Sequence, residues 1–229
     1  MVDWKKLRKK TGHNLNKCIL KELYYVSSLA KNNLEVILPN GSIHILECPK
    51  RIKLSSTLFE RKYSCLDYKG CDLCCIGFHS LFNCLEINSN TERVIKQHNP
   101  NIIKIKVNGK EFKYFDINHE NPDSNCNLNK KGQGCQVHNE NPITCMFPLI
   151  HFRQFNKNEV RIVKTYYGRN WAMHCPVKFN KYKNYEEYIE DTLWKFVRLK
   201  KYIKILNVDT HINTIIKQLQ YRKFKTICN

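Results

Sequence analysis

The amino-acid sequence predicts an α+β fold in a single domain, in which irregular loops rest on a small antiparallel sheet and helices lie at both ends. Three observations support this prediction: helical periodicity towards both termini, two Asn-Gly hairpin signals, and two cysteine-rich segments without regular periodicity. The chain has 229 residues, of which 42% are hydrophobic and 11% aromatic, and this is enough to bury a core. We therefore expect a folded globular protein.

The first half of the chain is expected to contain one helix and two hairpins. Apolar residues recur at helical spacing over residues 4–31. Two β-rich runs then flank Asn40-Gly41, and another two flank Asn108-Gly109. Because Asn-Gly is the preferred sequence of a tight hairpin turn, we predict hairpins over 34–47 and 102–117.

The remaining segments show no internal repeat. Residues 48–85 and 119–150 are rich in cysteine, glycine and asparagine, and they are expected to form loops and short helices. The regular elements expected elsewhere are a helix over 91–98, a strand over 159–167, and helices over 182–206 and 208–222.

These segments suggest a division of the chain into three parts. Residues 1–47 form an N-terminal helix and hairpin, and residues 48–180 form a cysteine-cluster core that we expect to bind metal. Residues 181–229 form a basic helical segment packed on that core.

The chain is strongly basic, with 39 Lys and Arg against 20 Asp and Glu, a formal net charge of +19. Such an excess favours acidic partners, among them nucleic acid, an anionic membrane surface and an acidic protein. Ordinary solvated lysines would also account for much of it, and anionic metal–thiolate centres would neutralise part of it. No apolar run reaches the roughly 18 residues of a membrane span.

The twelve cysteines are well above ordinary usage, and metal ligands or disulfides would explain them. The basic N-terminal residues lack the apolar run of an export signal, so we expect a cytoplasmic protein with reduced thiols. Eight of the cysteines fall in two loop-rich groups and one isolated position, and these are the candidate ligands: Cys65, Cys71, Cys74, Cys75, Cys126, Cys135, Cys145 and Cys175.

The spacing of these cysteines suggests how they would be used. In a helical segment, Cys71 lies one turn from both Cys74 and Cys75. Because neighbouring side chains diverge, the tandem pair indicates either two metal sites or one ligand beside a cysteine that does not bind metal. A glycine-rich turn is expected to bring Cys126 and Cys135 together. Eight thiolates suit two four-thiolate centres, either two 4Fe–4S iron–sulfur clusters or zinc. Buried structural thiols are the alternative explanation.

The order of these motifs is similar to that of a known family. The runs GCDLCC (Gly70–Cys75) and CQVHNENPITCMFP (Cys135–Pro148) resemble the CxxCxxCC cysteine-cluster family, which is described as a zinc- or iron-chelating domain. The resemblance implies metal binding by the clustered cysteines. Asn141 stands where the family has arginine, and His138 where tyrosine is usual. A related group, the flagellin lysine N-methylases, combines the cluster with S-adenosylmethionine.

Three hypotheses of function follow, and whether the protein is an enzyme stays open. The first is an iron–sulfur or zinc protein with a redox or cluster-dependent accessory role. The second is a zinc-stabilised nucleic-acid-binding module, because Lys195–Asn229 contains nine Lys and Arg with Tyr202, Tyr221 and Phe224 interleaved. A helix with these aromatics in the core would explain the same pattern. The third, an S-adenosylmethionine-dependent protein methyltransferase, rests on the resemblance alone.

Overall fold

The structure is a computed structural model, and it describes residues 15–60, 81–83, 89–117, 126–130, 134–137, 147, 150–164 and 185–228. Helices and sheets both contribute, so the predicted α+β class is confirmed. The described residues fall into two compact units. Unit 1 lies within Met1–Tyr24, Glu35–Ile45 and Lys69–Cys145, and unit 2 within Tyr25–Leu34, Leu46–Tyr68 and Met146–Asn229. The chain therefore passes back and forth between the units rather than forming two consecutive domains.

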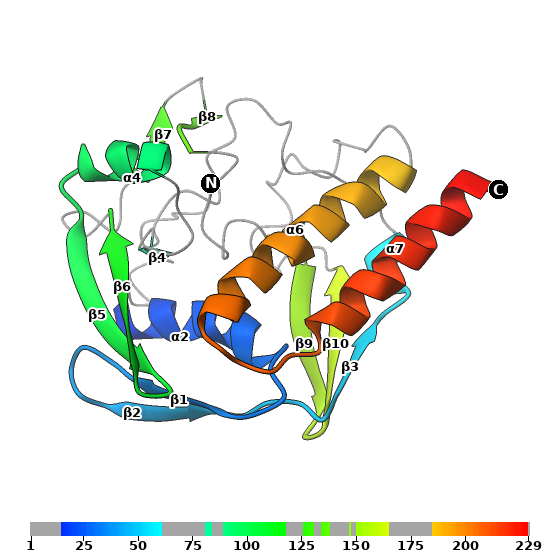
Figure 1. Cartoon of the computed structure of the whole chain (residues 1–229), viewed down its shortest axis with the longest axis horizontal. Helices are drawn as coiled ribbons and strands as arrows, with labels where there is room; N and C mark the ends of the chain where they lie inside the picture. Colours follow the sequence, from blue (N-terminus) through cyan, green and yellow to red (C-terminus); the bar gives the residue numbers. More distant parts are fainter. Residues whose placement is uncertain are drawn as a thin grey trace, which may run out of the picture. The chain divides into compact units, whose positions relative to one another are not determined.

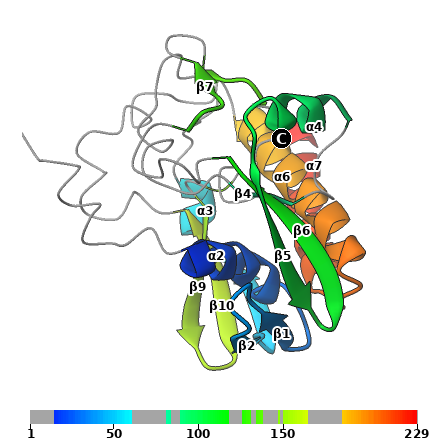
Figure 2. The same cartoon turned by 90° about the vertical axis from the view of Figure 1, so that its left-hand side faces the viewer.

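Unit 1 is built on a five-stranded sheet in the order β2-β1-β5-β6-β4. Its longest part is the hairpin of β5 (Asn101–Val107) and β6 (Lys110–Asp116), whose strands pair over their full length (Figure 2). The short strand β4 (Leu81–Asn83) pairs with the end of β6. Strand β5 is buried at alternate positions, which places Ile103, Ile105 and Val107 in the interior.

The turn of this hairpin has the predicted sequence and geometry. Asn108 and Gly109 both have positive φ, 49° and 77°, as a two-residue type I′ turn requires. Asn108 also ties the turn to the neighbouring strand β1 (Leu34–Ile37), because its side-chain Oδ1 accepts a 2.9 Å hydrogen bond from the Glu35 amide. The amide of Asn108 in turn donates to the Glu35 carbonyl, also at 2.9 Å. The prediction of a hairpin at this point is confirmed.

The first predicted hairpin has a wider loop. Strands β1 and β2 (Ile43–Leu46) are neighbours in the sheet, and the loop between them is closed by a 2.9 Å hydrogen bond from the Leu38 amide to the Ser42 carbonyl. Gly41 has a φ of 80°, whereas Asn40 has no positive φ and instead accepts hydrogen bonds from the amide and hydroxyl of Ser42. Here the asparagine side chain shapes the turn by local hydrogen bonding.

Unit 2 contains a three-stranded sheet in the order β3-β10-β9. Strand β10 (Glu159–Lys164) pairs antiparallel with β9 (Ile150–Asn156) and parallel with β3 (Arg51–Leu54). The parallel pair differs from the antiparallel pairing that we expected. Strand β3 lies in a segment where the sequence predicted loops and short helices, and nearly all of β9 lies in a stretch for which no element was predicted. Only the strand at β10 was predicted. The pairing of β3 with β10 joins residues more than 100 positions apart, which local periodicity does not reveal.

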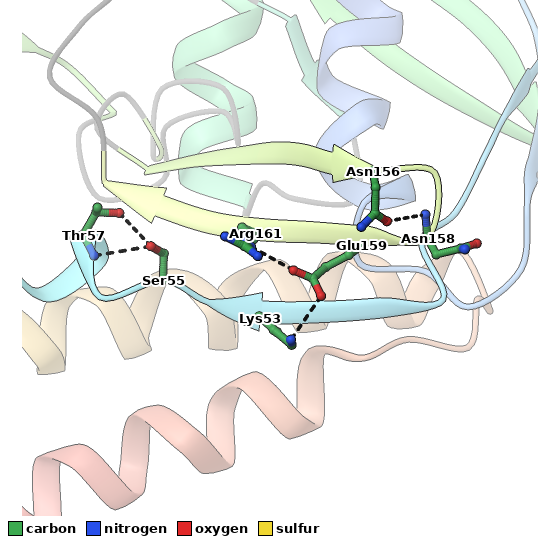
Figure 3. A network of polar contacts seen from close by, with 7 residues as sticks. All are labelled: Lys53, Ser55, Thr57, Asn156, Asn158, Glu159 and Arg161. Atoms are coloured by element: carbon green, nitrogen blue, oxygen red, sulfur yellow. Dashed lines mark hydrogen bonds and ion pairs between the residues drawn. The ribbon is translucent and has the colours of Figure 1, made fainter.

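Glu159 links the parallel pair through a polar network (Figure 3). One carboxylate oxygen accepts a 2.8 Å hydrogen bond from Nε of Arg161, and the other lies 3.2 Å from Nζ of Lys53. Just beyond the end of β3, the Ser55 hydroxyl oxygen accepts hydrogen bonds from the amide and the hydroxyl of Thr57. Thr57 is the first residue of the short helix α3 (Thr57–Glu60). These contacts hold both ends of a four-residue strand.

Two long helices complete unit 2. Helices α6 (Tyr185–Ile205) and α7 (Ile212–Cys228) run side by side in opposite directions (Figure 1). Helix α6 ends where Asn207 adopts a φ of 54°, a conformation that asparagine tolerates. The connecting residues bond to the chain after α2 (Leu15–Ser27), since the His211 amide donates to the Leu29 carbonyl and the Lys31 amide to the Asp209 carbonyl.

An aromatic cluster forms part of the core of unit 2. Phe147 is 1% exposed, and its ring centre lies 5.9 Å from that of Tyr25, 5.9 Å from that of Phe152 and 5.6 Å from that of Phe196. Spacings of this kind are favourable for edge-on and offset aromatic pairs. Within the described residues, no helix is long and apolar enough to cross a membrane.

Candidate metal centre

A small hairpin in unit 1 carries two of the eight candidate ligands. Strands β7 (Asn129–Lys130) and β8 (Gly134–Cys135) pair antiparallel, with Asn129 opposite Cys135. Cys126 begins the turn that leads into β7, because its carbonyl accepts a 2.8 Å hydrogen bond from the Asn129 amide. The Gln136 amide then donates to the Leu128 carbonyl at 2.8 Å and extends the pairing. The hairpin therefore returns Cys135 towards Cys126, as the sequence predicted.

A hydrophobic cluster supports this hairpin from one side. Both Cys126 and Cys135 are half-buried and pack against five buried side chains from α4 (Ser89–Lys96), the end of β6 and the hairpin itself: Ile95, Phe115, Ile117, Leu128 and Val137. The Asn127 side chain donates a 3.1 Å hydrogen bond to the Ile117 carbonyl and attaches the hairpin to the chain after β6. The two thiols thus lie on a fixed base rather than on an isolated loop.

Burial and charge act on these thiols together. The pKa of Cys135 is raised, first because burial disfavours the thiolate and then because the Cys126 thiolate would lie close by. The backbone amide of Val137 opposes the shift by hydrogen bonding to the sulfur. Cys126 and Cys135 pack against the same hydrophobic cluster, and both are free thiols rather than a disulfide. A cation shared by both would replace this repulsion with attraction.

The other six candidate ligands, Cys65, Cys71, Cys74, Cys75, Cys145 and Cys175, lie outside the described residues. In the described part of the chain, no three His, Cys, Asp or Glu side chains gather closely enough to hold a metal ion. The structure therefore places two of the eight candidate ligands on one small hairpin, and the composition of a complete centre stays a prediction.

His98 lies beside the hairpin, although the sequence analysis did not include it. It is half-buried and follows α4, and its Nε2 is 3.5 Å from the side-chain nitrogen of Gln136, next to Cys135. A histidine so placed could orient the hairpin or donate a hydrogen bond near the thiols. Because 28 residues separate His98 from Cys126, no sequence spacing pointed to it.

The side chains of Cys48 and Cys228 are also described, and neither belongs to the candidate centre. Cys48 is half-buried, and its Sγ donates to the Asn32 carbonyl at 2.6 Å, while burial raises its pKa to about 11. These contacts are those of a structural thiol. Cys228 is exposed at the end of α7.

Comparisons with known proteins returned no match. No protein-family model matches the chain, and neither the curated proteins nor the solved structures contain a significant relative.

Proposed function

We propose that the protein binds metal through cysteine thiolates and that Cys126 and Cys135 supply two ligands of one centre. The observation that supports this is the β7–β8 hairpin, whose two half-buried thiols pack against one hydrophobic cluster. Two thiolates would supply half of a four-thiolate zinc or iron–sulfur centre, and the second half would come from elsewhere in the chain.

The remaining ligands would come from the other six candidates, which gives eight thiolates for two four-thiolate centres. We favour iron–sulfur clusters, two of the 4Fe–4S type, with zinc as the alternative. The role is then redox or accessory to a cluster-dependent reaction, since the apolar base beneath Cys126 and Cys135 would limit solvent access and influence a cluster potential. Thiolate ligands also require a reducing compartment such as the cytoplasm.

Anaerobic purification of the full chain, followed by metal analysis and absorption spectroscopy, tests the proposal. Bound iron with a broad absorption near ~400 nm is expected for sulfide-bridged clusters. The variants Cys126→Ser and Cys135→Ser should each lose about half of the bound metal, because one of two four-thiolate centres is disrupted. A colourless protein that holds zinc would select the alternative metal while leaving the ligand assignment intact.

Cys48→Ser is the matched control, because Cys48 is also half-buried but lies in unit 2 outside the candidate set. It should retain the full metal content, and serine can still donate to the Asn32 carbonyl. Circular dichroism of each variant separates loss of a ligand from loss of the fold. A Cys126→Ser/Cys135→Ser double variant that is folded and holds as much metal as the native chain would refute the assignment.

A further inference from the structure

Helix α7 carries large side chains on two opposite sides. The inner side is buried and consists of aliphatic residues in the first half of the helix: Ile212, Ile215, Ile216 and Leu219. Spacings of four, three and four residues place another set on the opposite side, and we name this set the outer stripe: Lys217, Tyr221, Phe224 and Cys228. Tyr221 is 59% exposed and Phe224 is 65% exposed.

These exposures separate two explanations of the basic and aromatic C-terminal segment. If the aromatic residues of this segment belonged to the core, Tyr202, Tyr221 and Phe224 would all be buried. Tyr202 on α6 is buried at 3% exposure, but Tyr221 and Phe224 are among the most exposed large apolar side chains described. Two aromatic rings one helical turn apart on an exposed face require a functional explanation more than scattered apolar residues do.

All the charged side chains of helix α7 are cationic. Helix α7 contains four Lys and Arg and no acidic residue. Lys223 is neutralised by Glu190 on α6 at 3.1 Å, and Arg222 lies over the Phe59 ring at 4.1 Å. Lys217 belongs to the stripe, and Lys225 lies 5.2 Å from the centre of the Tyr221 ring; both are exposed. The aromatic rings are therefore interleaved with cations on the same face.

We propose that the outer stripe binds single-stranded nucleic acid. Bases would stack on Tyr221 and Phe224, while Lys217 and Lys225 would neutralise adjacent phosphates. Stacking on a ring requires no particular base, so this surface recognises strands with little sequence preference. The formal net charge of +19 would favour the approach of any such strand. This inference is independent of the metal centre, because all four residues lie in unit 2.

Other occupants fit the stripe less well. A second copy of the chain would bring two α7 helices of the same charge together, which electrostatic repulsion opposes. An anionic membrane surface is usually bound by a helix that separates its cations from its apolar residues, whereas here both occupy one face. An acidic protein would satisfy the lysines but leave the paired aromatic rings without a specific role.

Fluorescence anisotropy with the full chain and a labelled oligouridylate of about 20 nucleotides tests this inference, since one binding site spans only about 4–16 nucleotides. Tyr221→Ala/Phe224→Ala should weaken binding at least about tenfold, because two stacking contacts are lost. Lys217→Ala/Lys225→Ala should reduce the slope of log K against log salt by about 1.4, the value for two phosphate contacts on a single strand.

Phe155→Ala is the matched control, because Phe155 is 58% exposed on β9 and also lies against a cation, Arg161 at 3.3 Å. It should bind the oligonucleotide as the native chain does. Equal affinity of the Tyr221→Ala/Phe224→Ala variant and the native chain would overturn the inference, as would no binding at low salt. Binding of polyglutamate with the same dependence on Tyr221 and Phe224 would also overturn it, in favour of an acidic protein.

Discussion

The Nζ atom of Lys164, at the end of β10, lies 3.9 Å from the centre of the Tyr188 ring on α6. Lys164 is only 7% exposed, and the ring faces an ammonium group that is largely removed from water. Two charged residues on α6, Lys195 and Asp191, also act on Lys164. Their side chains form an ion pair with an N–O distance of 2.8 Å. Burial, followed by repulsion from Lys195, lowers the pKa of Lys164 to about 7, while Asp191 opposes the shift.

This arrangement predicts a stability that rises with pH. The unfolded chain keeps the Lys164 proton up to a pKa of 10.5, whereas the folded chain loses it near 7. Between these values the unfolded state binds more protons, so the free energy of unfolding rises by at most about 1.4 kcal/mol per pH unit. Below about pH 7 the cost of the buried charge is fully present. Lys164→Met should therefore be more stable than the native protein at about pH 6. Its free energy of unfolding should also rise less with pH than that of the native protein.

Urea unfolding at about pH 6, 8 and 10 measures this difference, and the titration of other groups cancels between the two proteins. Lys113→Met is the control, because Lys113 is exposed on β6. If the native and Lys164→Met proteins show the same change in stability across this pH range, the lowered pKa of Lys164 is not the cause of the pH dependence.

Glu159 should give the opposite pH dependence. Hydrogen bonds from Arg161 and then Lys53 lower the pKa of Glu159 below 4.5. Its contribution to stability is therefore present above pH 4.5 and is lost as the pH falls through the lowered pKa. Glu159→Gln should reduce stability at neutral pH and show a smaller further loss in acid, as measured by urea unfolding. Glu111→Gln is the control, since Glu111 is 48% exposed in its pair with Lys104 and should change little.

The turn of the β5–β6 hairpin should be sensitive to substitution for a conformational reason. A Cβ added at Gly109 would meet no atom within 4 Å, so the cost of Gly109→Ala arises from its φ of 77°. We expect a loss of about 1 kcal/mol, the usual cost of the left-handed conformation for a residue with a side chain. Asn108→Ala should lose about 1 kcal/mol or more, because it also removes the hydrogen bond to the Glu35 amide.

Thermal or urea unfolding of both variants, beside the exposed β5 variant Lys106→Ala, measures these losses. A Gly109→Ala variant as stable as Lys106→Ala would show that the turn is not held in the conformation described here.

Removal of metal should loosen the β7–β8 hairpin before the rest of unit 1. The proposed ligands Cys126 and Cys135 flank the hydrogen bond from the Gln136 amide to the Leu128 carbonyl. A metal that joined the thiols would add to the support that the hydrophobic cluster gives this two-residue ladder, so amide exchange at Gln136 should become faster after chelation. Exchange along β5 should not change. Hydrogen exchange with mass spectrometry would contradict the metal assignment if Gln136 were equally protected with and without chelator.

Much of the regular structure was predictable because its signals are local. Asn108-Gly109 determines both the turn and the pairing of β5 with β6. Apolar periodicity identified α4 and α6 to within three residues, whereas α7 begins four residues and ends six residues later than predicted. The return of the chain from Cys126 to Cys135 was also predictable, since only eight residues, two of them glycines, lie between them. The predicted helix over 4–31 is described from Leu15 and ends at Ser27, because Leu29 and Lys31 bond instead to the α6–α7 connection.

The sequence alone determined the α+β class, the hairpins and which cysteines are candidates, because these depend on neighbours in the chain. Tertiary structure alone decided that β3 lies parallel to β10, that Lys164 is buried while Tyr221 and Phe224 are exposed, and that His98 lies beside Gln136. The physical reason is that burial and long-range pairing depend on which surfaces meet, and that choice is made by the free energy of the whole fold. By hydropathy alone Lys164 would be expected at the surface and Phe224 in the core, and the structure shows the reverse for both.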